Sequence, residues 1–401
     1  MKNRFLSLGS MLCLALVVNA CATFEKPVSI RVAQISERAL TKEDNGIKVS
    51  VSVLGDEEAK QIFGIDPALR NIQAVWVAVE NKTSSPLILL PTAIDPEYFS
   101  PLEVAFAYRE AFNDDVNTAI EEHLLDLNFP VRSPIYPGSR VSGYVFTNWT
   151  KGMKVIDIDL IGDAFSQNFT FFAPNPDSSQ GQEIVARLEI MFSPGQERSL
   201  QDENELRQTL EQLPCCVLKE KNRLSSEPLN IVIIGEFDDW MTAFTRRGYR
   251  YQALTPRYVF GRVQDLSGFK SSRGYIAAQA HSIRLWRTPI RFKGKPVWIG
   301  QTGVRLGGRF ADKTSAEITT PLDPHVDEAR YNIAQDLAYS QSLIKIGFVK
   351  GSGHINSSDV EEVAEEGHYR TAGLRVVLVF AHRPSSLNDI DFFNWETPVG
   401  Q

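Results

Sequence analysis

Short stretches in which apolar and polar residues alternate dominate the first half of the chain and constrain its fold most strongly. In Ile47–Val53 the apolar side chains fall on every second residue, which is the period of a strand with one buried face. Similar runs, separated by short polar turns, follow at residues 74–79, 87–90, 141–146, 155–161 and 169–172. A helical pattern capped by Asn113 and ending at Leu127 interrupts them. The sequence therefore predicts a β-sandwich domain with one helical insertion over residues 21–192.

The character of the sequence changes after a predicted linker and helix at residues 193–227. Leu229–Ile234 is a continuous apolar run, as in a strand buried on both faces, and a helical pattern follows it. Lys293-Gly294 joins two strand-like runs as a tight hairpin, and Asp323-Pro324 has the composition of a helix start. Helices mixed with strands predict an α+β domain over residues 228–401, in which some strands can pair in parallel.

Chain length and net charge limit the classes of protein to which this chain can belong. A chain of 401 residues is longer than one hydrophobic core usually serves, which predicts two domains. The formal net charge is -7, and it becomes -9 if Lys2 and Arg4 are removed with an N-terminal signal. An acidic chain of this kind is not expected to bind nucleic acid in general.

The first twenty residues predict export. Lys2 and Arg4 precede an apolar stretch at residues 5–18, which is followed by a small residue before Cys21. At 14 residues this stretch is shorter than the roughly 20 that a membrane-spanning helix needs. No later stretch approaches that length, so no transmembrane helix is predicted.

Cys21 directly after Ala20 resembles the lipobox of bacterial lipoproteins, although Asn19 departs from the small residue usual at its position. The resemblance implies that residues 1–20 are a signal peptide and that Cys21 carries the acyl chains that hold the protein to a membrane. Ala22 in place of Asp favours, by the same resemblance, the outer membrane, with the folded domains in the periplasm. The alternative is that Cys21 is an ordinary residue near a conventional cleavage site.

Two of the four cysteines, Cys13 and Cys21, belong to the N-terminal segment, so only the adjacent pair Cys215-Cys216 remains in the folded part. We expect this pair to pack as two small apolar residues after Leu213-Pro214. A strained disulfide ring, a redox site or a metal site are the alternatives.

No metal or cofactor is predicted from the sequence. The nearest approach to a ligand set is Asp323, His325 and Asp327, which could supply oxygen and nitrogen ligands. Their spacing suits the start of a helix better, because acidic residues in the first turn favour its positive end.

Basic residues gather between Arg246 and Arg309, where 14 Lys and Arg residues stand against one acid, Asp265. Eleven of the 14 are Arg, whose guanidinium group suits a two-point grip on phosphate or carboxylate. We therefore expect a basic face that binds an anionic envelope lipid or glycan. The arginines assigned to this contact are Arg262, Arg284, Arg287 and Arg291. The alternative is that acidic residues between Asp323 and Glu366 neutralise the same face within the chain.

His281 and Asp265 are the candidate acid–base residues of an alternative, hydrolytic function. In that hypothesis Arg262 and Arg284 hold a phosphate-containing lipid or glycan, and His281 or Asp265 transfers the proton. His281 among apolar neighbours is more simply a hydrogen-bonded core residue. The sequence contains no nucleophile elbow, phosphate loop, dinucleotide-binding glycine pattern or zincin helix, so a binding function is preferred.

Six segments occur in a characteristic order: Pro228–Val232, Phe260–Asp265, His281–Trp286, Gly294–Gly300, Leu322–Arg330 and Gly373–Arg375. In order and spacing they resemble the LssY C-terminal domain family, in particular its lipoprotein members, over about residues 213–401. That family has no settled activity. Its namesake domain is attached to membrane proteins with a phosphatidic-acid-phosphatase-like module, which implies a link to envelope lipids by analogy. The chain departs from the family pattern at Pro321, His325 and Ala372, which puts a polar site built from those positions in doubt.

The combined expectation is a lipid-anchored envelope protein whose second domain recognises an anionic envelope component. Two alternatives come from other classes of function. One is the hydrolase described above, and the other is an assembly lipoprotein whose partner is another envelope protein.

Overall fold

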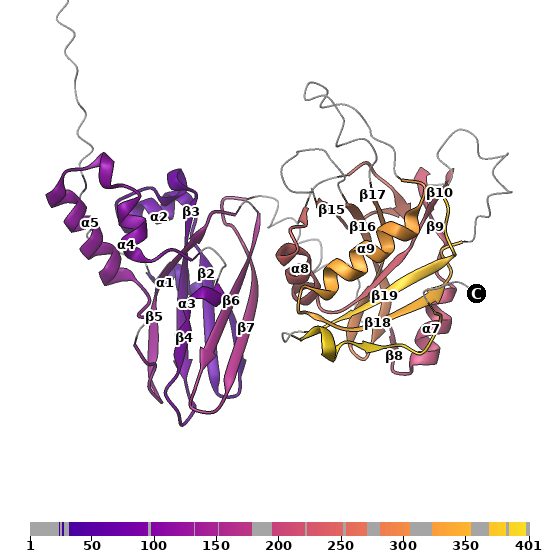
Figure 1. Ribbon diagram of the computed structural model, residues 1–401, viewed down its shortest axis with the longest axis horizontal. Helices are drawn as coiled ribbons and strands as arrows, with labels where there is room; N and C mark the ends of the chain where they lie inside the picture. Colours follow the sequence, from indigo (N-terminus) through magenta and orange to yellow (C-terminus); the bar gives the residue numbers. More distant parts are fainter. Residues whose placement is uncertain are drawn as a thin grey trace, which may run out of the picture.

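The computed structural model describes residues 24, 26–27, 32–94, 98–131, 133–150, 152–178, 195–220, 223–251, 254–270, 281–304, 323–353, 369–381 and 385–397. These residues are mostly β-sheet with a few helices. Strands before residue 179 form two sheets and strands after residue 194 form two others, so strand pairing divides the described residues into an N-terminal and a C-terminal part (Figure 1). The predicted signal peptide and Cys21 lie outside the described residues.

The two sheets of the N-terminal part share one apolar core. The first sheet contains, in spatial order, β1 (Leu40–Asp44), β2 (Ile47–Val53), β3 (Ile72–Asn81) and β5 (Arg140–Asn148). The second contains β4 (Ile88–Leu90), β6 (Met153–Ile161) and β7 (Ser166–Pro174). All these pairs are antiparallel. Val51 and Val77 of the first sheet and Ile158 and Phe171 of the second meet in the core, as the alternation in the sequence predicts.

Helices cover the other face of the first sheet. Three of them, α2 (Asp56–Phe63), α4 (Pro101–Phe106) and α5 (Asp114–Leu127), gather at one end of this part (Figure 1). Shorter helical segments are α1 (Val32–Glu37), η1 (Pro67–Arg70), α3 (Pro91–Ile94) and η2 (Arg109–Ala111). The predicted helical insertion is confirmed as α5, which begins where the Asn113 side chain accepts a hydrogen bond from the Val116 N–H at 2.9 Å.

The C-terminal part is built on one large mixed sheet. Its main path runs in the order β12 (Arg250–Tyr251), β15 (Leu266–Lys270), β16 (His281–Phe292), β17 (Lys295–Val304), β11 (Ile231–Ile234), β19 (Leu374–Phe380), β18 (Leu343–Lys350) and β20 (Asp391–Phe392). Central strands β11 and β19 pair in parallel, which the sequence allowed for. The predicted hairpin at Lys293-Gly294 is confirmed, with φ values of 49° and 82° that fit a tight turn between twisted strands.

Both faces of this sheet are covered. On one face, α8 (Phe237–Arg246) and α9 (Val326–Ala338) pack through residues such as Phe244 and Leu337 against Ile233 and Leu285. On the other face lie α7 (Glu203–Glu211) and a small sheet in the order β10 (Arg223–Pro228), β9 (Cys216–Glu220), β13 (Tyr258–Val259) and β14 (Arg262–Val263). Neighbouring residues of a strand point to opposite faces of the sheet. Leu266 of β15 and Ile283 and Leu285 of β16 point toward α8, and the residues next to each of them in the strand point toward the other face.

The structure differs from the sequence analysis in two places within this part. The segment predicted as a linker joins the C-terminal core: β8 (Arg198–Leu200) pairs with β16, and Leu206 and Leu210 of α7 are fully buried. Helix α9 begins one residue after His325 rather than at Asp323-Pro324.

Helix α8 also contacts the N-terminal part (Figure 1). Arg246 pairs with Asp157 of β6 through Nη2 and Oδ1, 2.6 Å apart, and Phe237 meets Phe172 of β7 edge to face at 5.7 Å. The Lys42 ammonium lies 3.8 Å from the Asp238 carboxylate. The helix therefore links the two parts through charge pairs and one aromatic contact.

Candidate functional site

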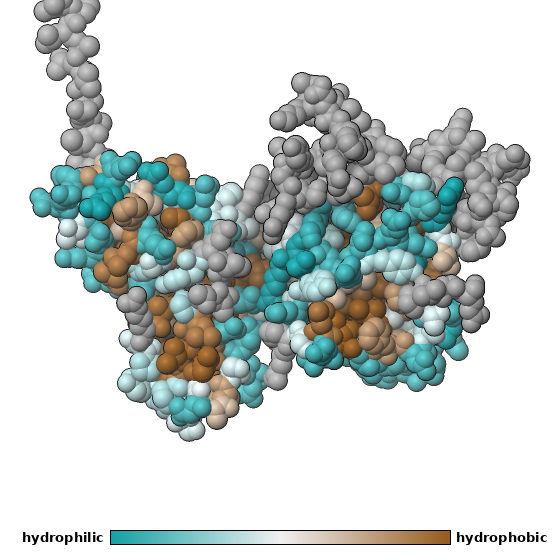
Figure 2. Space-filling view, viewed as in Figure 1, coloured by the Kyte–Doolittle hydropathy of each residue, from teal (hydrophilic) through white to brown (hydrophobic). Residues whose placement is uncertain are grey.

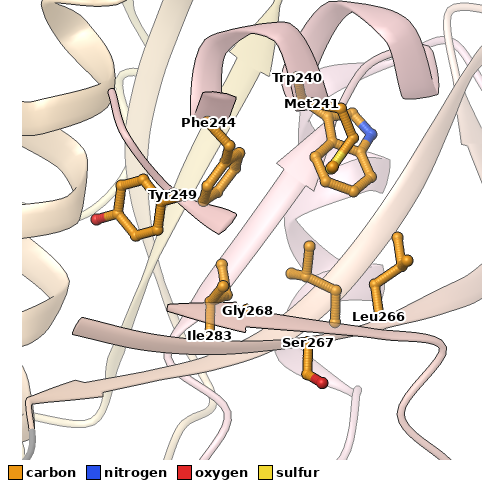
Figure 3. A pocket seen from close by; sticks show the side chains of 9 residues that line it. Trp240, Met241, Phe244, Tyr249, Leu266, Ser267, Gly268 and Ile283 are labelled. Carbon is orange, nitrogen blue, oxygen red and sulfur yellow. The ribbon is translucent and has the colours of Figure 1, made fainter. Parts of the chain in front are cut away.

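A mainly apolar pocket, called the α8 pocket here, lies between α8 and strands β15 and β16 (Figure 3). It encloses about 380 Å³ of space, counting the part open to solvent. The lining residues are Trp240, Met241, Phe244, Tyr249, Leu266, Ser267, Gly268, Ile283 and Leu285.

Local geometry explains why apolar side chains meet here. Trp240 and Phe244 are four residues apart in α8 and therefore share one helix face. Across from them, Leu266 pairs with Leu285 in the β15–β16 register, and Gly268 pairs with Ile283. Figure 3 shows the Leu266 and Ile283 side chains pointing toward α8, while the Ser267 hydroxyl points away. Because Gly268 has no side chain on this face, the sheet leaves space beneath the helix.

A charged group that we call the Asp336 cluster adjoins Tyr249, at one end of the pocket. Asp336 Oδ1 accepts a hydrogen bond from Arg247 Nε at 2.8 Å, and its Oδ2 accepts one from Lys270 Nζ at 2.5 Å. Tyr249 turns its hydroxyl away from the other lining residues (Figure 3), and His281 stands directly opposite Lys270 in the strand pairing. Two cations share one carboxylate, so the cluster carries one excess positive charge.

The titrating groups of the cluster are perturbed by their surroundings. Burial raises the pKa of Tyr249, and the negative charge of Asp336 raises it further, so the hydroxyl stays protonated. Burial lowers the pKa of His281, and the charge of Lys270 adds to this effect. The Nδ1 atom of His281 is buried without a hydrogen-bond partner among the described residues. His281 is therefore neutral near pH 7 and becomes charged only in acid.

We expect wild-type protein to lose stability relative to a His281→Gln variant as the pH falls below about 6.5, the usual pKa of an unfolded chain's histidine. The folded pKa is lower, so protons bind the unfolded state first and favour it. Above pH 6.5 the difference in unfolding free energy between the two proteins should be constant, and the loss should grow until the folded pKa is passed. Thermal unfolding at pH 7.5 and pH 5 measures this difference.

The control for this experiment is His325→Gln, which changes an exposed histidine just before α9. It should follow the wild type at both pH values. An unchanged gap between His281→Gln and wild type would show that His281 has the same proton affinity in both states.

The pocket and the cluster are built mostly from residues that follow α8. Residues 247–368 match the family model described as LssY C-terminus. The LssY match confirms the resemblance over this segment, which contains Tyr249, β15, β16 and α9. Trp240, Met241 and Phe244 of α8 precede the LssY match, so part of the pocket wall lies outside it. No curated protein matches the chain.

All four arginines predicted to bind an anion lie within the LssY match, and two of them are buried. Arg284 is 3% exposed and donates to Gln301 Oε1 at 2.8 Å. Arg287 is 4% exposed and donates to the carbonyls of Ile290 and Val297 at 2.9 and 3.1 Å. Their guanidinium groups therefore bind within the protein.

The other two arginines also have partners in the chain. Arg262 forms an ion pair with Asp265. Arg291 Nε donates to Glu197 at 2.7 Å, and Glu197 also pairs with Arg287. These contacts favour neutralisation within the chain for these four residues, although the acids are not those between Asp323 and Glu366. Anion binding by the four arginines stays a prediction.

His281 and Asp265, the two candidate acid–base residues, lie on opposite faces of the sheet. His281 shares the α8 face with Ile283 and Leu285, whereas Asp265 precedes Leu266 and accepts a hydrogen bond from the Arg287 backbone at 2.7 Å on the other side. Burial raises the pKa of Asp265, and the charge of Arg262 only partly opposes this. The structure thus separates His281 from Asp265 and from the arginines proposed to hold the anion.

The positions where the sequence departs from the family pattern are partly described. Pro321 lies outside the described residues. The His325 N–H donates to Asp323 Oδ1, and the Ala372 N–H donates to Asp327 Oδ2, at 2.8 and 2.7 Å. Both departures therefore lie at the N-terminal end of α9.

The side chains of Asp323, His325 and Asp327 do not form a metal-binding site. Asp327 is engaged by the Thr371 hydroxyl at 2.8 Å and by Arg330 at 3.0 Å. Within the described ranges, no group of three or more His, Cys, Asp or Glu side chains could hold a metal ion. Over the same ranges, no helix has the length and apolar character needed to cross a membrane.

Sequence reasoning missed the residues that organise this site. Asp336 contacts Arg247 and Lys270, which precede it by 89 and 66 residues. It was counted only among the acids that could neutralise the basic face. No local pattern marks such contacts, because they depend on how α9 lies across the sheet.

The Cys215 and Cys216 sulfurs form a disulfide, which was one of the alternatives to the expected apolar packing of this pair.

Proposed function

We propose that this chain is a lipid-anchored protein of the bacterial envelope whose C-terminal domain binds an anionic lipid. In this proposal Cys21 carries the anchor at the outer membrane and the folded parts lie in the periplasm. The N-terminal part is proposed to be a β-sandwich, because its two sheets share one core. The observation that carries the binding proposal is the apolar α8 pocket next to the positively charged Asp336 cluster.

The pocket supports a lipid in preference to a glycan. Its lining is mainly apolar, and each methylene removed from water contributes about 0.8 kcal/mol. Figure 2 shows a mainly hydrophilic surface over α8, so the apolar lining lies beneath this helix rather than on its outer side. In this proposal part of an acyl chain, not a whole diacyl lipid, enters the pocket.

The Asp336 cluster supports an anionic head group. Lys270 and Arg247 together outnumber the single carboxylate of Asp336. A head-group phosphate beyond Tyr249 could accept hydrogen bonds from these cations, which are stronger than hydrogen bonds between neutral groups. His281, opposite Lys270, adds a third positive charge when it is protonated.

Titration calorimetry with a lauroyl lysophosphatidic acid and a lauroyl lysophosphatidylcholine, both below their micelle concentrations, tests this proposal on protein that begins at Ala22. Wild type should bind the anionic lipid more tightly, and the preference should shrink as salt is added. Gly268→Val places a side chain on the pocket face and should weaken both lipids by on the order of 50-fold, equivalent to about three methylenes left in water.

Lys270→Gln separates the contribution of charge from that of the pocket. It should weaken only the anionic lipid, by roughly 10-fold for one charged hydrogen bond. Lys293→Gln is the matched control, because it removes the same charge at the opposite end of β16. Equal binding by wild type and Gly268→Val would rule out the α8 pocket as the lipid site.

The same samples distinguish the alternative functions. Mass spectrometry that finds the lipid consumed would establish a hydrolase and contradict a pure binding role. The anchor has a separate test, since Cys21→Ser protein should leave the membrane fraction without detergent. Retention of Cys21→Ser in that fraction would contradict lipidation at this residue.

A further inference from the structure

A disulfide joins the adjacent residues Cys215 and Cys216 where the chain passes from α7 into β9. Cys215 is exposed and Cys216 is half-buried. Gly353 lies beside the pair: a Cβ atom on it would be 3.8 Å from Cys215 Cβ and 3.9 Å from Cys216 Sγ. The bond is therefore at the surface of the C-terminal domain, far in sequence from the α8 pocket residues on β15 and β16.

Stabilisation does not account for this bond. In the chain-entropy description, a disulfide stabilises a protein by restricting the unfolded chain, and the effect grows with the length of the loop that it closes. A bond between neighbouring residues closes no loop of other residues. Apolar packing does not account for it either, because Cys215 is exposed.

A buried positive charge lies next to the pair. Arg375 is fully buried, and its Nη2 atom donates to the carbonyls of Leu213 and Pro214 at 3.1 and 2.5 Å. The Pro214 carbonyl belongs to the peptide bond that leads into Cys215. All the hydrogen-bond partners of Arg375 among the described residues are backbone carbonyls, so no carboxylate there cancels its charge.

The charge of Arg375 bears on the chemistry of the cysteines once they are reduced. Burial lowers the pKa of Arg375 to about 10, so the guanidinium remains charged at neutral pH. A nearby cation favours a thiolate over a thiol, and the thiolate is the reactive form of cysteine. The surroundings thus combine an accessible sulfur with a fixed positive charge.

We infer that Cys215–Cys216 is a redox-active site that exchanges electrons with a dithiol protein of the oxidoreductase class. The reductant's thiolate attacks Sγ of Cys215, the exposed residue of the pair, a sulfur–sulfur bond forms between the two proteins, and Cys216 leaves as a thiolate and takes up a proton. The reductant's second thiol loses its proton and attacks the first, which releases Cys215 as a thiolate that is protonated in turn. Two electrons and two protons pass to the pair, and the reductant ends as a disulfide.

The first test uses the full chain from Ala22, isolated in air, and a thioredoxin-type reductant that lacks its second cysteine. This reductant should be trapped as a mixed disulfide, and peptide mapping should place the link on Cys215. Cys215→Ser is the matched control and should trap no more than a few per cent of the wild-type amount. Trapping mainly on Cys216, or none on the folded protein, would overturn the proposal.

The second test separates a redox site from a structural bond. An intact dithiol reductant should add two hydrogens to the folded protein, which should then bind one phenylarsine oxide across the two thiols. The reduced and oxidised forms should unfold within about 2 °C of each other, because the bond closes no loop. Free thiols in the aerated protein, or a fall in melting temperature above about 5 °C on reduction, would contradict the inference.

Discussion

Replacing Arg375 with methionine is expected to lower the free energy of unfolding of the C-terminal part by more than about 4 kcal/mol. Arg375 has no exposed surface, and its guanidinium donates to five backbone carbonyls. These belong to Leu210, Leu213, Pro214, Leu229 and Gly351. Each buried carbonyl left without a donor costs about 1–3 kcal/mol, and methionine supplies none.

The local reason for this large effect is that Arg375 joins three separate segments. Leu210 lies in the last turn of α7 and Leu213 just after the helix, where carbonyl groups lack the donors that a helix interior provides. Leu229 leads into β11, and Gly351 follows β18. A guanidinium group at a helix C-terminus also interacts favourably with the helix dipole. Without Arg375, α7 should therefore detach from the C-terminal core at a lower urea concentration than the one that unfolds the large sheet.

Urea unfolding followed by hydrogen exchange at residues 203–211 measures both effects for Arg375→Met. Arg375→Lys should be intermediate, because an ammonium keeps the charge but has three donors in a smaller arrangement. Arg198→Met is the control, since the Arg198 side chain is 59% exposed and its loss should change stability by less than about 0.5 kcal/mol. Unfolding of Arg375→Met at the wild-type urea concentration would contradict this account.

The sequence predicted those elements whose pattern is local. The alternation in Ile47–Val53 gives β2, the Asn113 cap gives the start of α5, and Lys293-Gly294 gives the β16–β17 turn. Each depends on residues within a few positions of one another. The LssY resemblance, carried by several such segments in order, is confirmed over residues 247–368.

What the sequence did not predict depends on contacts between distant residues. Arg284 and Arg287 are predicted to lie on a basic face because charged side chains are seldom buried, yet both lie inside the fold, as does Arg375. Most of the protein groups that satisfy them are backbone carbonyls, which leave no signature in the sequence. The 14 cations between Arg246 and Arg309 therefore indicate a basic face, whereas the structure gives most of those that it describes a partner within the chain.

The α8 pocket could not be predicted from the sequence either, because it also depends on how distant segments are placed. It exists because Gly268 and Leu266 of β15 face the same side as Ile283 and Leu285 of β16, and because α8 crosses above them. Strand register and helix placement set this space, and neither is fixed by composition. The match to the LssY family marks the segment but not the cavity.

Glu227 is the second residue whose replacement should have a large effect, because its carboxylate joins a buried chain of hydrogen bonds. It is 5% exposed and accepts hydrogen bonds from two nitrogens of Arg257, the shortest at 2.7 Å, and one from Gln301 at 2.6 Å. Gln301 in turn accepts one from the buried Arg284. Glu227→Gln would leave Arg257 and Arg284 near each other without this negative charge, and we expect a loss of about 3–5 kcal/mol.

The contribution of Glu227 to the free energy of unfolding should decrease as the pH falls. Burial raises the pKa of Glu227, but the hydrogen bonds and charge of Arg257, with those of Gln301 and Arg284, outweigh burial and hold the pKa below its usual value. The unfolded chain therefore takes up the proton first as the pH falls. The stabilisation should be complete above about pH 4.5, the ordinary range of a glutamate, and should be lost as the pH falls through the lower folded pKa.

A double variant separates the charge pair from its surroundings. Glu227→Leu alone should be about as destabilising as Glu227→Gln, because both leave Arg257 partly buried without its counter-charge. Adding Arg257→Leu should restore much of the loss, since replacing both members of a buried pair with apolar residues is often nearly neutral. Urea unfolding of the three variants at pH 7 measures the coupling. Additive losses in the double variant would mean that Glu227 acts through Gln301 rather than through Arg257.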